Sequence, residues 1–287
     1  MFAIFKRELR SYFQTPIGCL FMGLFLLLMG IFFSFGNLFP RRSEYMGFLG
    51  GTLLIFLFAV PLLTMRLFSE EKRQKTDQLL LTSPVSIAGI VCGKFFAALA
   101  VFCATLLITV SYALVIAVHG DLQTWETLGS YIGFVFLGAS YISIGLFISA
   151  ATENQLNAAL LTFFTLMIIW ILDPLAQAIP ATTQIGVISA AVLLGFLVIF
   201  LFINTRNWVI ALGAAALGAL VIWLFYSFNR NVYFGFIQNF MGWFSLNRRY
   251  ESFSMGLLRV DSLLYYVSFS GLFLFLTVRL IEKRRWN

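Results

Sequence analysis

Eight stretches of predominantly apolar residues run through this chain of 287 residues. Each is about 17 residues or longer, close to the length that a helix needs to cross the hydrocarbon core of a bilayer. Because only helices and closed barrels satisfy their backbone groups in lipid, the pattern predicts an all-α integral membrane protein, a polytopic helical bundle. The stretches lie near residues 17–36, 51–68, 88–118, 129–151, 156–176, 184–203, 208–226 and 263–281.

The number of spans depends on the sixth and seventh stretches, because the link between them carries only one cation, Arg206. If both were re-entrant, six spans would remain, so we expect about 6 to 8 transmembrane helices. Either even number puts the two termini on the same side. Most of the 19 Lys and Arg residues fall in segments that a cytosolic N-terminus would place inside, so the positive-inside rule predicts cytosolic N- and C-termini.

Composition excludes several classes of function. Only 11% of the residues are charged and 61% are hydrophobic, and the net charge of +7 is scattered in small groups at segment ends, so we expect no nucleic-acid partner. Three cysteines lie inside apolar segments, and His119 is the only histidine. Zinc sites, bis-histidine haem and Ser-His-Asp catalysis are therefore poorly supported, and we predict neither a metal site nor a catalytic residue.

The chain divides into an amphipathic helix at 1–16, a transmembrane domain at 17–281 and a cytosolic tail at 282–287. In the first segment, apolar side chains recur at helical spacing opposite Lys6, Arg7 and Arg10, which is typical of a helix lying on the inner membrane surface. An outer segment at 227–262 mixes aromatic and charged residues and predicts interfacial helices or a cap.

Two short polar features interrupt the apolar pattern. A turn at the inner surface forces an antiparallel helical hairpin between the fourth and fifth spans, and the small residues around it allow close helix packing. On the outer side, Asp173 and Pro174 interrupt the fifth span. A charge at that depth is costly unless it has a partner, so this pair is a candidate outer gate. The turn consists of Thr152, Glu153, Asn154 and Gln155.

The most polar run of the inner side, at 69–87, separates the second and third spans and predicts a short helix at the membrane surface. A charged cluster leads through a Leu-rich stretch to Ser-Pro-Val-Ser, and Gly-Lys follows at the start of the third span. This order and spacing resemble the signature of type 2 ABC exporter permeases, the membrane subunits that work with a separate ATP-binding subunit. The matching residues are Glu70, Glu71, Lys72, Arg73, Thr76, Leu79–Thr82, Ser83–Ser86 and Gly93–Lys94.

The resemblance implies that the run at 69–87 is a cytosolic coupling helix. Its charged residues would meet the ATPase, and its leucines would fix the helix to the spans. The family often has Gly directly before the Thr, where this chain has Lys75, so we expect a more regularly helical backbone there. The residues assigned to ATPase coupling are Glu70, Glu71, Lys72, Arg73, Lys75, Thr76, Asp77, Leu80, Ser83, Pro84 and Lys94.

The family also implies an exporter in the bacterial cytoplasmic membrane. The chain would couple ATP hydrolysis by two ATPase copies to outward movement of a substrate, beside a second permease subunit in a homodimer or heterodimer. Membrane lipids and an outer accessory protein are further expected partners. The chain has no G-x-x-x-x-G-K-[ST] phosphate loop, so it is not expected to be an enzyme itself. ATP and Mg belong to the partner, and no cofactor is expected on this chain.

The end of the chain is similar to the gliding-motility-type branch of this family. Two alternative functions stay open at this point. A force-transmitting membrane scaffold would use the same ATPase-facing apparatus. A secondary transporter would need ionisable groups in mid-span to bind ions or protons, whereas the carboxylates of this chain lie at segment ends.

Overall fold

The structure is a computed structural model that describes residues 1–40, 48–76, 85–119, 123–228 and 230–286. Within these ranges every regular element is a helix. Eight helical stretches are long and apolar enough to cross a bilayer, the sixth and seventh predicted spans among them. The prediction of an all-α polytopic membrane protein is therefore confirmed. The chain forms two compact units, unit 1 (Met1–Ile169 and Leu246–Asn287) and unit 2 (Trp170–Ser245).

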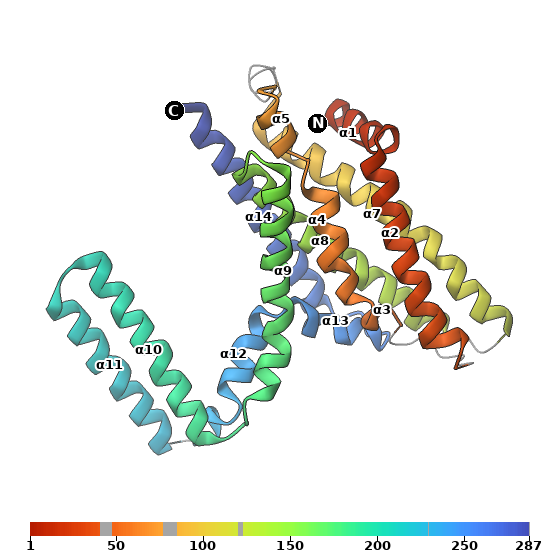
Figure 1. Cartoon of the computed structure of the whole chain (residues 1–287). Helices are drawn as coiled ribbons and strands as arrows, with labels where there is room; N and C mark the ends of the chain where they lie inside the picture. The colour runs from red at the N-terminus through yellow and green to blue at the C-terminus, as the bar shows by residue number, and fades with distance from the viewer. Residues whose placement is uncertain (41–47, 77–84, 120–122, 229, 287) are drawn as a thin grey trace. The chain divides into compact units, whose positions relative to one another are not determined.

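Unit 1 holds most of the helices and both chain ends (Figure 1). Its elements are α1 (Phe2–Gln14), α2 (Pro16–Phe33), the π-helix η1 (Ser34–Leu38), α3 (Phe48–Gly51), the 3-10 helix η2 (Leu53–Ile55), α4 (Phe56–Thr64), α5 (Ser69–Arg73), α7 (Ile87–His119), α8 (Thr124–Ala151), the first part of α9 (Gln155–Ala178), α13 (Leu246–Ser254) and α14 (Val260–Trp286). The last helix thus includes most of the predicted tail at 282–287.

The second predicted span is not one regular helix. The stretch Phe48–Arg73 is divided into α3, η2, α4 and α5. The first break follows Gly50 and Gly51, which lower the helical propensity of the backbone. At the break, the Thr52 hydroxyl donates a hydrogen bond to the Leu49 carbonyl oxygen at 2.8 Å. The third span, by contrast, is the unbroken 33-residue helix α7.

Helix α8 is the centre of unit 1, and it packs against α4, α7, α13 and α14. Small residues allow these close approaches, as the sequence predicts. A Cβ atom at Gly138 would lie 2.5 Å from Phe102 Cε1 on α7, and one at Gly145 would overlap the Thr64 side chain on α4. About two thirds of the apolar window of α8 is buried, 67%, so this helix is held by protein on most sides.

Unit 2 contains the end of α9 and a helical hairpin. Its further elements are α10 (Thr183–Thr205), α11 (Trp208–Phe228), the 3-10 helix η3 (Arg230–Tyr233) and α12 (Phe236–Phe244). The two hairpin helices pack against each other, and only 6% of the apolar window of each is buried. Such side chains are suited to lipid. The predicted outer segment at 227–262 does form short helices, and their interfacial position stays a prediction.

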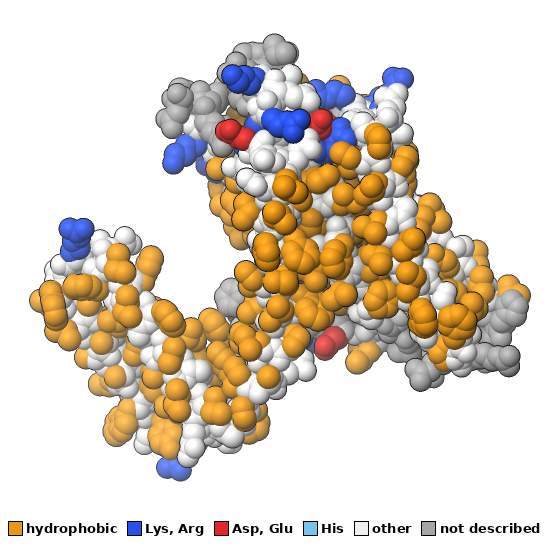
Figure 2. All heavy atoms as spheres, viewed as in Figure 1, with side chains coloured by type: hydrophobic (Ala, Val, Ile, Leu, Met, Phe, Trp, Pro, Cys, Tyr) orange, Lys and Arg blue, Asp and Glu red, His pale blue; other side chains and the backbone are white. Residues whose placement is uncertain are grey.

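Charged side chains gather at one end of unit 1. Figure 1 shows the N-terminus, the C-terminus, α1 and α5 at this end, and Figure 2 shows Lys, Arg, Asp and Glu side chains above a surface that is mostly hydrophobic. We call it the charged end; it comprises α1, α5, the first turns of α7 and the turn between α8 and α9.

Candidate functional site

The first turn of α5 is fixed to the last turns of α8. The fully buried Ser149 hydroxyl accepts hydrogen bonds from the Phe68 and Ser69 amides at 3.1 and 3.3 Å, and it donates to the Met65 carbonyl oxygen at 3.2 Å. Amides at a helix start have no partner inside the helix, so Ser149 supplies one from another element. Lys72 adds a second tie, because its ammonium donates to the Ala150 carbonyl oxygen.

A buried lysine joins α5 to α1 and α7. The Lys94 side chain is 1% exposed, and its Nζ lies 3.1 Å from Glu8 Oε1 and 3.0 Å from Glu71 Oε1. It also donates to the Leu67 carbonyl oxygen at 2.6 Å and lies 5.1 Å from the centre of the Phe68 ring. All the donor capacity of this buried ammonium is thereby used, which is the condition under which a buried charge is tolerated.

Arg7 binds the same two carboxylates from the solvent-exposed side. Its Nη2 lies 2.7 Å from Glu8 Oε1 and 2.8 Å from Glu71 Oε1. Burial opposes ionisation of Glu8, but the Lys94 charge and the hydrogen bonds from Arg7 and Lys94 outweigh it and hold the pKa of the Glu8 carboxyl below its ordinary value. We call Arg7, Glu8, Glu71 and Lys94 the charge cluster. It brings together residues of three helices.

Gly93 makes this meeting of helices possible. A Cβ atom at this position would lie 3.1 Å from Ile4 Cγ2 and 3.2 Å from the Met1 carbonyl oxygen, both at the start of α1. Those distances are tighter than ordinary van der Waals contact. The Gly-Lys pair of the sequence signature therefore has two distinct structural roles, because Gly93 allows α1 to approach α7 and Lys94 binds its carboxylate.

A second arginine fixes α5 to the link between α1 and α2. Arg66 Nε pairs with Glu70 Oε2 at 3.0 Å, and its Nη atoms donate to Thr15 Oγ1 at 2.7 Å and Ser11 Oγ at 3.1 Å. The Tyr12 hydroxyl donates to the Leu63 carbonyl oxygen at 2.6 Å. Glu70 and Glu71 thus both point toward their own chain. The outward positions of α5 and its C-terminal end are Arg73, Gln74 and Lys75, which are exposed.

The backbone conformation at Lys75 contradicts the prediction of a more regular helix at this position. Its φ is +57°, in the left-handed region that glycine favours. The Lys75 amide donates to the Lys72 carbonyl oxygen at 3.0 Å, and the Thr76 amide donates to the Glu71 carbonyl oxygen at 2.9 Å. This pair of bonds is the Schellman motif, which ends a helix. The geometry of the helix end therefore forces Lys75 into the conformation that a glycine would adopt.

The other predicted site residues at the charged end lie around α5. Glu153 and Asn154 are exposed, whereas Thr152 and Gln155 are half-buried, and their turn directly follows the helix that binds α5. Lys6 and Arg10 are exposed on α1. The buried stripe of α1 contains Ile4 and Tyr12 together with Glu8, so one charged residue belongs to the inward face. Asp77, Leu80, Ser83 and Pro84 lie outside the described residues.

At Asp173 and Pro174, the candidate outer gate, the helix differs from the predicted interruption of the fifth span. Pro174 lies inside α9, which continues to Ala178, so the fifth span is not interrupted there. A proline lacks only one amide donor, and near a helix end this loss is tolerated. Asp173 Oδ2 accepts a hydrogen bond from Ser245 Oγ at 2.6 Å. The polar partner that the sequence argument requires for this carboxylate is therefore present in unit 2.

Sequence reasoning missed Arg66, Ser149 and the inward position of Glu8. Two signals were available. Arg66 and Glu70 have the i, i+4 spacing of a helical ion pair, and Glu8 is the only acidic residue of α1. Nothing in the local sequence marks Ser149, because its partners are more than 75 residues away in the chain.

Comparison with known proteins agrees with this geometry. The family model of ABC-2 family transporter proteins matches residues 50–185, a range that contains α5, Lys94 and the turn between α8 and α9. No curated protein matches the chain. The gliding-motility-type branch stays a prediction. The chain thus contains an ABC-2 family transporter domain over residues 50–185, which, with its eight apolar helices, supports a multi-pass membrane subunit of the ABC transporter permease type.

Proposed function

We propose that this permease subunit couples ATP hydrolysis by a separate subunit to the outward movement of a substrate across the bacterial cytoplasmic membrane. The observation that carries the proposal is the fixation of α5 to α1, α7 and α8 at one end of unit 1. Both chain ends lie at this end as well (Figure 1), which supports cytosolic N- and C-termini.

The partner binds the charged end. Two ATPase copies, each holding ATP and Mg, act on two permease subunits in a homodimer or heterodimer. The outward-facing positions of α5 and its end carry Arg73 and Lys75, and the neighbouring turn carries Glu153 and Asn154, all exposed. This surface holds both signs of charge and suits a polar, water-exposed protein interface. An outer accessory protein remains a further candidate partner.

A movement of the ATPase partner would be transmitted to the membrane spans through the hydrogen bonds and ion pairs that hold α5. The Lys94 ammonium contacts carboxylates of α1 and α5 from the first turns of α7, and Ser149 binds the start of α5 from the end of α8. A displacement of α5 that preserves these bonds moves α1 and the adjacent ends of α7 and α8 with it. Breaking them costs the desolvation of buried charges, so concerted movement is the less costly response.

The test separates the partner surface from the internal cluster. Reversing Glu70 or Glu71 would break bonds inside the chain, so the informative variant is Arg73→Glu/Lys75→Glu, which changes only exposed side chains of α5 and its end. The tagged chain is purified from native membranes in mild detergent, and the proteins recovered with it are identified by mass spectrometry. We expect a protein with a phosphate loop in the wild-type sample and about tenfold less of it with the variant.

Arg206→Glu is the matched control, because Arg206 is also exposed but belongs to unit 2. It should leave recovery of the ATPase unchanged. Wild-type protein that is folded and carries no ATPase would refute the proposal and favour a secondary transporter. If the ATPase is recovered, stimulation of its activity by a transported substrate identifies an exporter, whereas activity without any cargo identifies a force-transmitting scaffold.

A further inference from the structure

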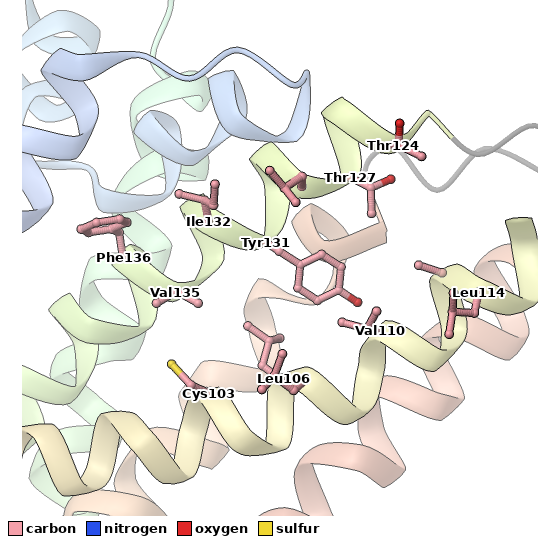
Figure 3. Close-up of a pocket in the computed structure, with 13 residues that line it drawn as sticks. Cys103, Leu106, Val110, Leu114, Thr124, Thr127, Tyr131, Ile132, Val135 and Phe136 are labelled. Atoms are coloured by element: carbon pink, nitrogen blue, oxygen red, sulfur yellow. The ribbon is translucent and has the colours of Figure 1, made fainter.

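An apolar cavity of about 560 Å³ lies between α7 and α8 (Figure 3). It is separate from the charged end and begins beyond the tight contact of Gly138 with Phe102. Side chains of both helices point into it, with Cys103, Leu106 and Val110 from α7 and Tyr131 and Val135 from α8 (Figure 3). The cavity thus follows the two helices toward the start of α8.

Of the three residues with hydroxyl groups in the lining, Tyr131 and Thr127 have hydrogen-bond partners, and Thr124 lies at the exposed end. The Tyr131 hydroxyl lies 3.1 Å from Thr109 Oγ1, and the Thr127 hydroxyl donates to the Gln123 carbonyl oxygen at 2.9 Å. Because these groups already have partners within the protein, a polar ligand would lose hydrogen bonds to water without regaining them here. The chemistry of the cavity suits a hydrocarbon.

The dimensions indicate a single hydrocarbon chain. The lining on α8 extends from Thr124 to Phe136, which is about 18 Å along a helix. This length is close to the thickness of one leaflet, about 15 Å, half of the hydrocarbon core. A groove of this length, lined by apolar side chains of two helices, suits one extended acyl chain.

The cavity is open to the surrounding lipid along its side. Leu107, Leu114 and Leu128 line it and are 70%, 61% and 53% exposed. At its end, Thr124 and the 81% exposed Trp125 form the first turn of α8. Tryptophan is favoured at the boundary between hydrocarbon and head groups, so this end of the cavity lies at the level of the lipid head groups.

We infer that the cavity binds one acyl chain of a membrane phospholipid, from the leaflet that meets the start of α8, with the head group beside Thr124 and Trp125. The bound chain fills the space between α7 and α8 and so stabilises their separation on this side of the Phe102 contact. This inference concerns the permease alone and does not depend on the proposed ATPase partner.

The test uses the full chain in bilayer nanodiscs that contain a phosphatidylethanolamine with a photoreactive diazirine near the end of one acyl chain. After illumination, adducts are mapped by mass spectrometry. Helix α10, which is almost entirely exposed, reports the labelling by bulk lipid. We expect adducts on the lining peptides of α7 and α8 to exceed those on α10 several-fold, and Val110→Phe to reduce this excess about tenfold.

Val135→Phe fills the cavity from the other helix and should have the same effect, so the test does not depend on the folding of one variant. Ile108→Phe is the matched control, because Ile108 is a 52% exposed residue of α7 that does not line the cavity; it should leave the adducts unchanged. Adducts on the lining that equal those on α10, or that persist in both filling variants, would overturn the inference.

Discussion

Replacing Lys94 with methionine tests the charge cluster most directly. Methionine keeps most of the side-chain length and removes the ammonium. The Glu8 and Glu71 oxygens, which both lie about 3 Å from Lys94 Nζ, then face each other with Arg7 as their only shared cation in the described structure. Removing one partner of a buried ion pair costs about 3–5 kcal/mol.

We expect a value at the lower end of that range, because two features reduce the loss of stability. The Glu8 and Glu71 side chains are 14% and 18% exposed, and Arg7, which remains, is 53% exposed, so water and Arg7 both screen the carboxylates. We therefore expect Lys94→Met to lower the free energy of unfolding by about 3 kcal/mol. The loss should be measured by equilibrium denaturation of the purified chain in mixed detergent micelles.

The matched control is Lys6→Met, which removes an exposed lysine from α1 and should change stability by less than about 0.5 kcal/mol. A triple variant, Lys94→Met/Glu8→Gln/Glu71→Gln, removes the buried charges together and should recover most of the loss, since a neutral replacement of a whole buried network is often close to neutral. Equal stability of Lys94→Met and Lys6→Met would refute the reasoning, and so would a triple variant less stable than the single one.

Three further predictions concern other parts of the fold. Lys75→Gly should raise the free energy of unfolding by about 1 kcal/mol in the same assay, because glycine removes the strain of the left-handed backbone. Glu8 contributes stability that is complete above its ordinary pKa of 4.5 and is lost as the pH falls through its lower native pKa. Amide hydrogen exchange of α1 should therefore accelerate below about pH 4.5 relative to a Glu8→Gln variant. Gly145→Val, which places methyl groups against Thr64, should destabilise the chain by about 1–3 kcal/mol in equilibrium denaturation, and a neutral effect would contradict the close packing of α4 and α8.

The spans could be predicted from the sequence because the bilayer acts on composition and length alone. The third predicted segment, 88–118, differs from α7 by only one residue at each end. The break after Gly51 and the continuation of α9 through Pro174 could not be predicted in the same way. Both depend on whether neighbouring groups replace a lost backbone bond, and hydropathy carries no information about that.

The position of the candidate site could be predicted, but not the direction in which its side chains point. The polar run and the Gly-Lys pair marked α5 and the start of α7. The inward direction of Glu71 depends on Lys94 of α7 and Arg7 of α1, and such long-range pairs leave no periodic pattern in the sequence. The backbone conformation of Lys75 could not be predicted either, because it follows from two hydrogen bonds at the helix end rather than from the propensity of lysine.

The unbroken length of α7 allows this helix to amplify a displacement from one end to the other. A close contact with α8, between Phe102 and Gly138, lies about 12 Å along the axis from Lys94 and about 26 Å from the last residue of the helix. If a stiff rod tilts about that fulcrum, its far end travels about twice as far as the end that carries Lys94. A shift of 1 Å at the charged end would thus become a shift of about 2 Å at the far end of α7.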